Sequence, residues 1–326
     1  MKKTVTALAA CAIALTAGAQ TPKAVNQHPF LAPYTTPYEI PPFEQIKVSD
    51  YIPALKAGIE QHNKEIAAIA NSKAEPTFEN VILAMDRAGD ILEKVVYVYG
   101  ALSESNSSPE LQAVADTFEP MLAAHQDEVS MNPALFKRVK ALYDKRDKLN
   151  LATDQKRLLE KYYKDFVRNG ALLNDKEQAE LKAINADLSN LYIKFNRNLL
   201  AATNAFEIVV DDVKDLAGLP ESNIAVAADE AKARGKEGKY VLTLHAPSRL
   251  PVLQYADNRD IRRKMWQGYT SLASAEPYDN KPIINKILQA RAKKAKLLGF
   301  KDYGSYMTDN VMAGSVKAAE DLLMQI

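Results

Sequence analysis

Histidine is the residue type in this chain best suited to catalysis or metal binding, and there are four: His28, His62, His125 and His245. None lies in an H-E-x-x-H sequence, which would hold zinc between two histidines on one helical face. His62 is followed three positions later by Glu65, and a helix would place both on one side. His125 and Glu128 have the same spacing. Each pair has the residue types for metal binding, but we favour the simpler interpretation that both lie on solvated faces of amphipathic helices.

The other candidates for chemistry also have simpler structural interpretations. His245 follows a strand-like run and precedes Ala246-Pro247, so we expect it at the end of a strand and not as a catalytic base. No serine occupies a G-x-S-x-G elbow. Gly235 and Gly238 are separated by only two residues, which fails the spacing of a phosphate-binding loop and predicts a turn. These patterns assign no catalytic, cofactor-binding or metal-ligating residue.

A basic segment near position 260 is the only stretch that suggests nucleic-acid binding. It contains Arg259, Arg262, Arg263, Lys264 and the single tryptophan, Trp266. Asp257 and Asp260 interleave with these residues, and the formal charge of the whole chain is only +1. We therefore predict a solvated helix face and no nucleic-acid partner.

The first nineteen residues have the pattern of an export signal. Lys2 and Lys3 form a basic start, residues 5–16 are a short apolar run, and Ala17-Gly18-Ala19 is a small-residue cleavage site. The run is too short to cross a bilayer. We expect cleavage after Ala19 and a periplasmic or otherwise exported protein that does not remain in the membrane. Lipoprotein processing at Cys11 is disfavoured, because only a few apolar residues precede the cysteine and the apolar run after it would have no role in the signal.

Removing this signal changes the chemistry open to the mature chain. Cys11 is the single cysteine, so the mature chain would have no disulfide, no thiolate nucleophile and no cysteine-bound metal. The loss of Lys2 and Lys3 takes away two of 42 basic residues and leaves 41 acidic ones, so the formal charge falls from +1 to −1. A hydrophobic content of 47% is ample for a packed core.

Helical periodicity dominates the elements that must position any site. Residues 26–42 are proline-rich and predict an extended arm laid over a surface. Apolar spacing and capping residues predict helices over 50–70 and 77–98, from 109 and 133 onward, and over 153–169, 174–203, 216–234, 248–256, 259–273, 282–298 and 315–326. Two short strands, 206–210 and 240–245, predict a small β insert paired at a distance in sequence.

The final helical pattern has a start signal but no closing signal. Ser315 is its expected N-cap. Its apolar stripe consists of Val316, Ala319, Leu322, Leu323 and Ile326. Because no cap closes this stripe, we expect the sequence to be the front part of a longer protein.

Several ordered stretches of the sequence resemble one family. They include P-P-F-E-Q-I at 41–46, Y-I-P-A at 51–54, E-P-T-F-E-N-V-I at 75–82, the run 158–168, L-L-A-A-T-N-A-F at 199–206, L-A-G-L-P at 216–220, Y-A-D-N-R-D-I-R at 255–262, Y-D-N-K at 278–281, and 292–303. From His28 onward the chain resembles the N-terminal part of the peptidyl-dipeptidases. These enzymes belong to the thimet oligopeptidase and oligopeptidase A family of zinc metallopeptidases.

The resemblance implies a mainly α fold: the multi-helical N-terminal lobe of a bilobal, zincin-type peptidase, with a small β insert around 206–245. After the signal peptide that the opening residues predict over 1–19, it implies an N-terminal helical region over 20–239 and the truncated beginning of the catalytic domain over 240–326. The family holds zinc on an H-E-x-x-H helix and a distal glutamate in the later half of its chain. No position here matches those residues, so no catalytic or metal residue is carried over.

The function implied is release of C-terminal dipeptides from short peptides by a zinc-dependent parent protein. Zinc would belong to that parent and not to residues 1–326, which we expect to be inactive without the missing C-terminal catalytic half. One alternative is an oligopeptidase that cuts internally in short peptides. Another is a complete, non-catalytic helical protein that binds peptides or acts as a scaffold.

Overall fold

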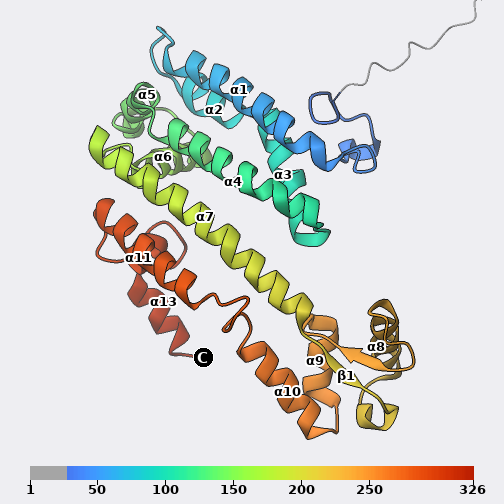
Figure 1. Cartoon of the computed structure of the whole chain (residues 1–326). Coiled ribbons are helices and arrows are strands. Elements are labelled where there is room, and N and C mark those ends of the chain that lie inside the picture. Colours follow the sequence, from blue (N-terminus) through green and yellow to red (C-terminus); the bar gives the residue numbers. More distant parts are fainter. Residues whose placement is uncertain (1–27) are drawn as a thin grey trace, which may run out of the picture.

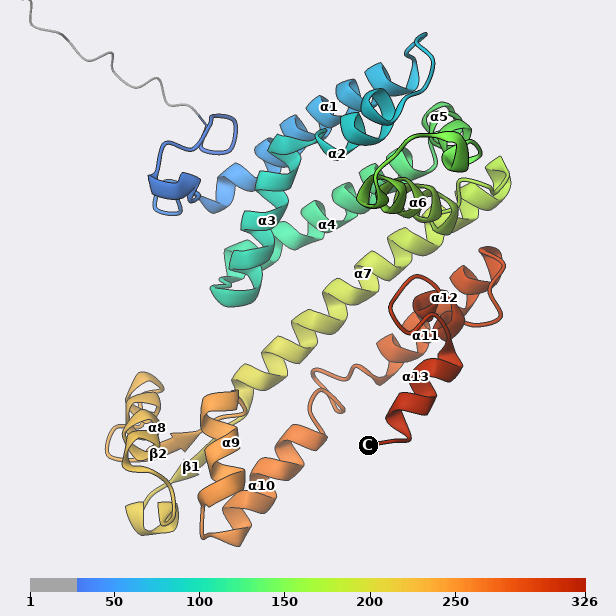
Figure 2. The same ribbon diagram turned by 180° about the vertical axis from the view of Figure 1, so that it is seen from behind.

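A computed structural model describes residues 28–326. The predicted signal peptide, its cleavage site and Cys11 lie outside the described residues. The structure is mainly helical, with one two-stranded antiparallel sheet in the described part. Figures 1 and 2 show a long central helix, α7 (Asp175–Ala205), that runs through most of the length of the molecule.

The N-terminal helices form a bundle that packs against α7 mainly through α4 (Figure 1). They are α1 (Tyr51–Ala70), α2 (Ala84–Asp86), α3 (Asp90–Ser105), α4 (Pro109–Ser130), α5 (Pro133–Tyr143) and α6 (Thr153–Arg168). Their buried apolar side chains form two cores, one among α1, α5 and α6 and one among α1, α3 and α4. These helices therefore act as one packed layer.

Helix starts in this layer follow the predicted capping residues. The Ser108 hydroxyl accepts from the backbone N–H of Leu111 at the start of α4. The Asn132 side chain accepts from two N–H groups of α5. Asn174 and Glu177 exchange hydrogen bonds as a capping box at the start of α7. Each start is confirmed because the capping atoms and the N–H groups they bond are close in sequence.

The continuous helix predicted over 77–98 is wrong. Thr77 does cap a helical segment, but that segment is a π-helical turn, Phe78–Leu83, followed by the single turn of α2. The chain then breaks at Gly89, whose φ is +92°, before α3 begins. A positive φ is easy for glycine and ends a right-handed helix, while the apolar residues on both sides keep facing one core.

The β insert forms at the far end of α7. Strand β1 (Ile208–Val210) pairs antiparallel with β2 (Tyr240–Leu242), with Val209 opposite Val241. Helix α8 (Glu221–Ala233) lies between them in sequence and packs on β2. The predicted pairing of distant strands is confirmed, although both strands are shorter than expected. The predicted turn is also confirmed, because Gly235 and Gly238 both have positive φ.

The remaining helices return along α7, as both views show (Figure 2). They are α9 (Ala246–Tyr255), α10 (Arg259–Thr270), α11 (Lys281–Leu297), α12 (Tyr303–Thr308) and α13 (Val316–Leu323). Helices α9 and α10 share a core with the sheet, and α11 packs on α7. The predicted domain division at residue 240 stays a prediction. Within residues 28–326, no helix is both long and apolar enough to span a bilayer.

Candidate functional site

A cavity of about 770 Å³ lies among the helices of the described chain. Its walls come from α1, α3, α4, α6, α7 and α11. The polar side chains in these walls are His62, Glu93, Tyr97, Glu119, His125, Gln126, Asp127, Ser130, Tyr162, Asp165, Asn169, Asn185, Ser189, Tyr192, Lys294 and Tyr303. A volume of this size is typical of ligand sites, so we take this cavity as the candidate functional site.

Two of the four histidines meet at this cavity. His62 Nδ1 on α1 lies 2.8 Å from His125 Nε2 on α4, and the two rings are inclined by 64°. His125 is only 3% exposed. Burial lowers the pKa of His62, and burial together with the neighbouring His62 lowers the pKa of His125 to about 4. Both rings are therefore neutral at pH 7, with one N–H shared between them.

The prediction of solvated faces is wrong for His125, and neither of the His–Glu pairs considered as the less favoured alternative forms a hydrogen bond. Glu65 instead accepts from the backbone N–H of Gly89 at 2.8 Å, which ties α1 to the break before α3. Glu128 is exposed on α4, while His125 is buried where α4 packs on α1. No three histidine, cysteine, aspartate or glutamate side chains gather as a metal site would require anywhere in residues 28–326.

A buried polar bridge crosses the other side of the cavity. The Asn185 amide on α7 donates to Asp127 Oδ1 on α4 at 2.7 Å, and its carbonyl accepts from Lys294 Nζ on α11 at 2.8 Å. Burial raises the pKa of Asp127 and lowers the pKa of Lys294. Asn185 therefore joins a carboxyl and an ammonium group that both lose hydration, and it fixes three helices relative to one another.

Glu119 on α4 and Glu93 on α3 are the carboxylates of the cavity that have no hydrogen bond or ion pair within the described chain. Burial raises the pKa of Glu119. Burial, with Glu119 as the next cause, raises the pKa of Tyr99 to about 12. Glu119 therefore places an unpaired carboxyl in a partly dehydrated wall.

A second hollow of about 550 Å³ adjoins the first along α7. The two share Glu119, Ser189 and Tyr192 in their walls. The Tyr192 hydroxyl accepts from Arg291 Nε on α11 at 2.9 Å, which holds this ring in place. Together the hollows form a groove between α3 and α4 on one side and α7 on the other.

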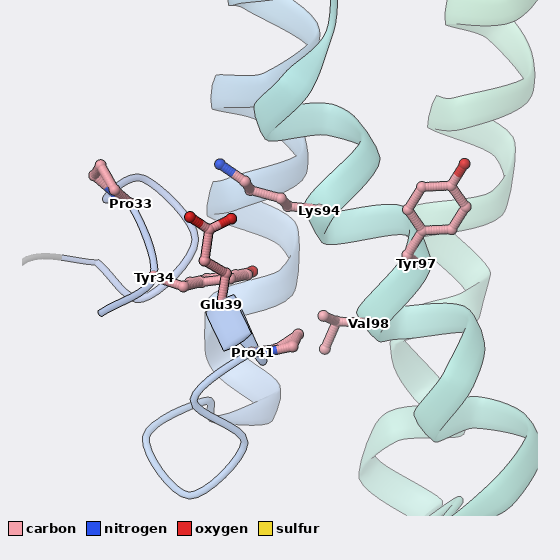
Figure 3. A pocket seen from close by; sticks show the side chains of 7 residues that line it. All are labelled: Pro33, Tyr34, Glu39, Pro41, Lys94, Tyr97 and Val98. Carbon is pink, nitrogen blue, oxygen red and sulfur yellow. The ribbon is translucent and has the colours of Figure 1, made fainter. Parts of the chain in front are cut away.

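A third hollow, of about 330 Å³, lies under the N-terminal arm (Figure 3). Pro33, Tyr34, Glu39 and Pro41 of the arm face Lys94, Tyr97 and Val98 of α3. Lys94 pairs with Asp90 at 2.6 Å and lies 5.6 Å from the centre of the Tyr34 ring. Phe30 is fully buried against Tyr51. For residues 28–42 these contacts confirm that the arm lies over a surface, but it is not extended throughout, because Pro37–Glu39 form a 3-10 turn.

The remaining candidates from the sequence have structural positions outside the cavity. His245 is the N-cap residue of α9, three residues beyond β2, and its ring contacts Thr243 and Asn204. In the basic segment, Arg262 donates to the Asp257 carbonyl oxygen at 2.9 Å and Arg263 pairs with Asp260. The side chains of Arg262 and Arg263 are thus bonded to residues at the start of α10.

Sequence reasoning missed the residues that matter most at the cavity. Asp127, Asn185 and Lys294 belong to three helices and show no local pattern. Glu119 is one of many carboxylates on amphipathic helices. The helical register gave no signal either, because Asp127 lies two residues after His125 and therefore on the opposite side of α4 from buried Phe118 and His125.

Comparison with known families gives two matches within the chain. Residues 55–178 match the N-terminal domain of neurolysin and thimet oligopeptidase. Residues 252–326 match peptidase family M3. The first match covers the helices that form most of the cavity, and the second covers the end of α9 and all of α10–α13.

Individual relatives agree with these matches. Dipeptidyl carboxypeptidase of Escherichia coli is 35% identical over 302 residues, which are 92% of this chain and 44% of that protein. Oligopeptidase A of the same organism is 31% identical over 90% of this chain and 44% of that protein. The organellar oligopeptidase A of Arabidopsis thaliana is 32% identical over 88% of this chain and 37% of that protein. The chain thus spans less than half the length of these relatives.

Proposed function

We propose that this chain, which belongs to peptidase family M3, is the front part of a zinc-dependent peptidyl-dipeptidase that releases dipeptides from the C-termini of short peptides. The observation that carries the proposal is the 35% identity to a dipeptidyl carboxypeptidase across 92% of the chain. The match to an N-terminal domain supports a position at the front of the longer protein.

The residues present do not fit the zinc site of such an enzyme. The sequence contains no H-E-x-x-H, and the described residues 28–326 gather no three metal ligands. We therefore propose that zinc and the general base are supplied by a catalytic half beyond this sequence. What residues 28–326 contribute is the packed helical lobe and the groove along α7, which would border the peptide path.

The first test is an activity measurement on the purified chain. With added zinc and an N-blocked tripeptide or tetrapeptide, we expect no release of a C-terminal dipeptide. Zinc-dependent turnover by the chain alone would show that the catalytic half is not needed. The coding sequence after codon 326 is the matched check, because the proposal requires an open reading frame that contains H-E-x-x-H.

Cleavage inside short peptides is the second candidate function. The 31% identity to oligopeptidase A favours it over activities outside the family. Mass spectrometry of the products made by the longer protein separates the two. Successive loss of C-terminal dipeptides supports the peptidyl-dipeptidase, whereas fragments from internal bonds support the oligopeptidase.

Export is part of the same proposal. The supporting pattern is the basic start, apolar run and small-residue site over residues 1–19. In a bacterial host we expect the processed chain in the periplasmic fraction, with glutamine 20 as its first residue by N-terminal sequencing. Recovery of the unprocessed chain in the cytoplasm would contradict it.

A further inference from the structure

We propose that the 770 Å³ cavity binds the positively charged side chain of a peptide, held by Glu119 and Glu93. This inference rests on the proposed function in one respect, that the ligand is a peptide. It goes beyond that function because it assigns a specificity site to helices of the N-terminal lobe, away from any catalytic zinc.

The charges in the cavity wall favour a cationic ligand. The carboxylates there are Glu93, Glu119, Asp127 and Asp165, and the single lysine or arginine is Lys294. Lys294 is bonded to Asn185 in the bridge to Asp127, and Asp165 is paired with Lys161 at 2.6 Å. Glu93 and Glu119 thus remain as carboxylates with no cation of the described chain beside them. A free carboxylate ligand would meet repulsion here.

Glu119 has the strongest need for a cationic partner. It is partly buried, and that burial raises its pKa because water is lost around the charged form. An ammonium or guanidinium group beside it would replace the lost hydration and restore the charged form. Glu93, on α3, is exposed and also lines the cavity, so it adds a second negative charge to the wall.

Tyrosine rings line the same space. Tyr97 on α3 and Tyr192 on α7 are both in the cavity wall, and the Tyr192 hydroxyl is already engaged by Arg291. Ring faces attract cations, and the attraction is largest where water is partly excluded. The Arg291 guanidinium already lies 5.4 Å from the centre of the Tyr192 ring, so the carboxylates together with the Tyr97 ring select arginine or lysine over a neutral side chain of the same length.

An independent observation comes from His125 in the cavity wall. Its Nε2 is bonded to His62, but its Nδ1 is buried with no hydrogen-bond partner among the described residues. The residue is 97% buried, since only 3% of it is exposed. Buried polar atoms nearly always have a partner, so this nitrogen marks an unfilled hydrogen bond in a residue of the cavity wall.

The test compares two peptides that differ only in charge. N-acetyl-Ala-Ala-Arg-Ala and its citrulline analogue have nearly the same shape, and acetylation removes the terminal ammonium group. We expect calorimetric titration of the purified chain at pH 7.5 to give about tenfold tighter binding of the arginine peptide. We expect that preference to weaken as salt is added, because screening acts on the ion pair.

Variants assign the preference to the cavity. Glu119→Gln should bind both peptides equally, whereas Glu128→Gln, an exposed change on the same helix, should keep the tenfold difference. Glu93→Gln is the second variant if Glu119→Gln does not fold, as judged by circular dichroism, and it should reduce the preference about threefold. Agmatine added as a competitor shows whether a free cation without a peptide backbone is sufficient.

The outcomes separate this inference from the proposed function. Equal affinity of the two peptides for the unaltered chain, or no binding of either, overturns the cation site. If the longer protein still releases dipeptides in that case, only the cation site fails. If the arginine preference is present and depends on Glu119 but the longer protein hydrolyses nothing, the cation site stands and the peptidase proposal fails.

Discussion

At the scale of single residues, the hydrogen bond between His62 and His125 makes the stability of the lobe depend on pH. Both rings have a lowered pKa, that of His125 reaching about 4, with burial as the first cause. As the pH falls through the ordinary histidine pKa of 6.5, the unfolded chain binds protons on these two rings, whereas the folded pair does not. Stabilisation by the neutral pair is therefore complete above about pH 6.5 and is lost as the pH falls toward about 4.

A substitution at His125 tests this directly. We expect His125→Gln to lower the free energy of unfolding by about 1–3 kcal/mol at pH 7.5, because a buried hydrogen bond is lost. The difference from the unaltered chain should shrink at pH 5, where the native pair itself is weakened. Urea unfolding of both proteins at pH 7.5 and pH 5 measures this difference in the free energy of unfolding. A difference that stays constant or grows toward acid would contradict the assigned direction.

Asn185 hydrogen-bonds to both Asp127 and Lys294 and so compensates each of these groups for part of its lost hydration. We expect Asn185→Leu to destabilise the chain by about 2–4 kcal/mol, because it separates two buried charged groups from their shared partner. Asn190→Leu is the matched control, since Asn190 is exposed on the same helix, and it should change stability by less than about 0.5 kcal/mol. Thermal unfolding of the three proteins provides the comparison, and similar melting temperatures for both variants would refute the bridge.

At the scale of elements, the contact between α1 and α3 depends on a glycine. A Cβ atom added at Gly58 would lie 2.9 Å from the backbone N and Cα of Leu92, so the two helices would have to separate. We expect Gly58→Ala to destabilise by about 1–3 kcal/mol, although alanine normally favours a helix. Gly100→Ala in α3 meets nothing within 4 Å and should stabilise by about 0.5–1 kcal/mol. Opposite signs in urea unfolding are the expected result, and two stabilising changes would contradict the close approach.

The elements also show what sequence reasoning can reach. The caps at Ser108, Asn132 and Asn174 were predictable, because the side chain and the N–H groups it bonds are two or three residues apart. The break at Gly89 was not predictable, since the apolar spacing continues across it. The left-handed conformation of Gly89 depends on how α1 packs on α3. The histidine pair was missed for the same reason: its members are 63 residues apart and meet only when α1 packs on α4.

At the scale of the whole molecule, separate cores are joined by polar side chains and by α7. The sheet and its helices have one core, and the N-terminal helices have two. Helix α11 contacts α7 through a smaller cluster, and the Asp127–Asn185–Lys294 bridge reinforces it. Arg168 of α6 adds a further link by donating to the Tyr306 carbonyl oxygen and pairing with Asp309. The groove walls are therefore held in place by packing on α7 and by a small set of polar side chains that cross between helices.

The outer face of α13 sets how the isolated chain behaves in solution. Leu322 and Leu323 are 61% and 69% exposed, and Met312 and Ile326 nearby in sequence are almost fully exposed. Several large apolar side chains exposed in one short segment favour self-association. We expect size-exclusion chromatography with light scattering to show aggregates of the unaltered chain, and the double change Leu322→Glu with Leu323→Glu to raise the monomer fraction several-fold. The melting temperature should not change, because neither side chain belongs to a core. A monodisperse, cooperatively melting monomer of the unaltered chain would show that this face does not drive association.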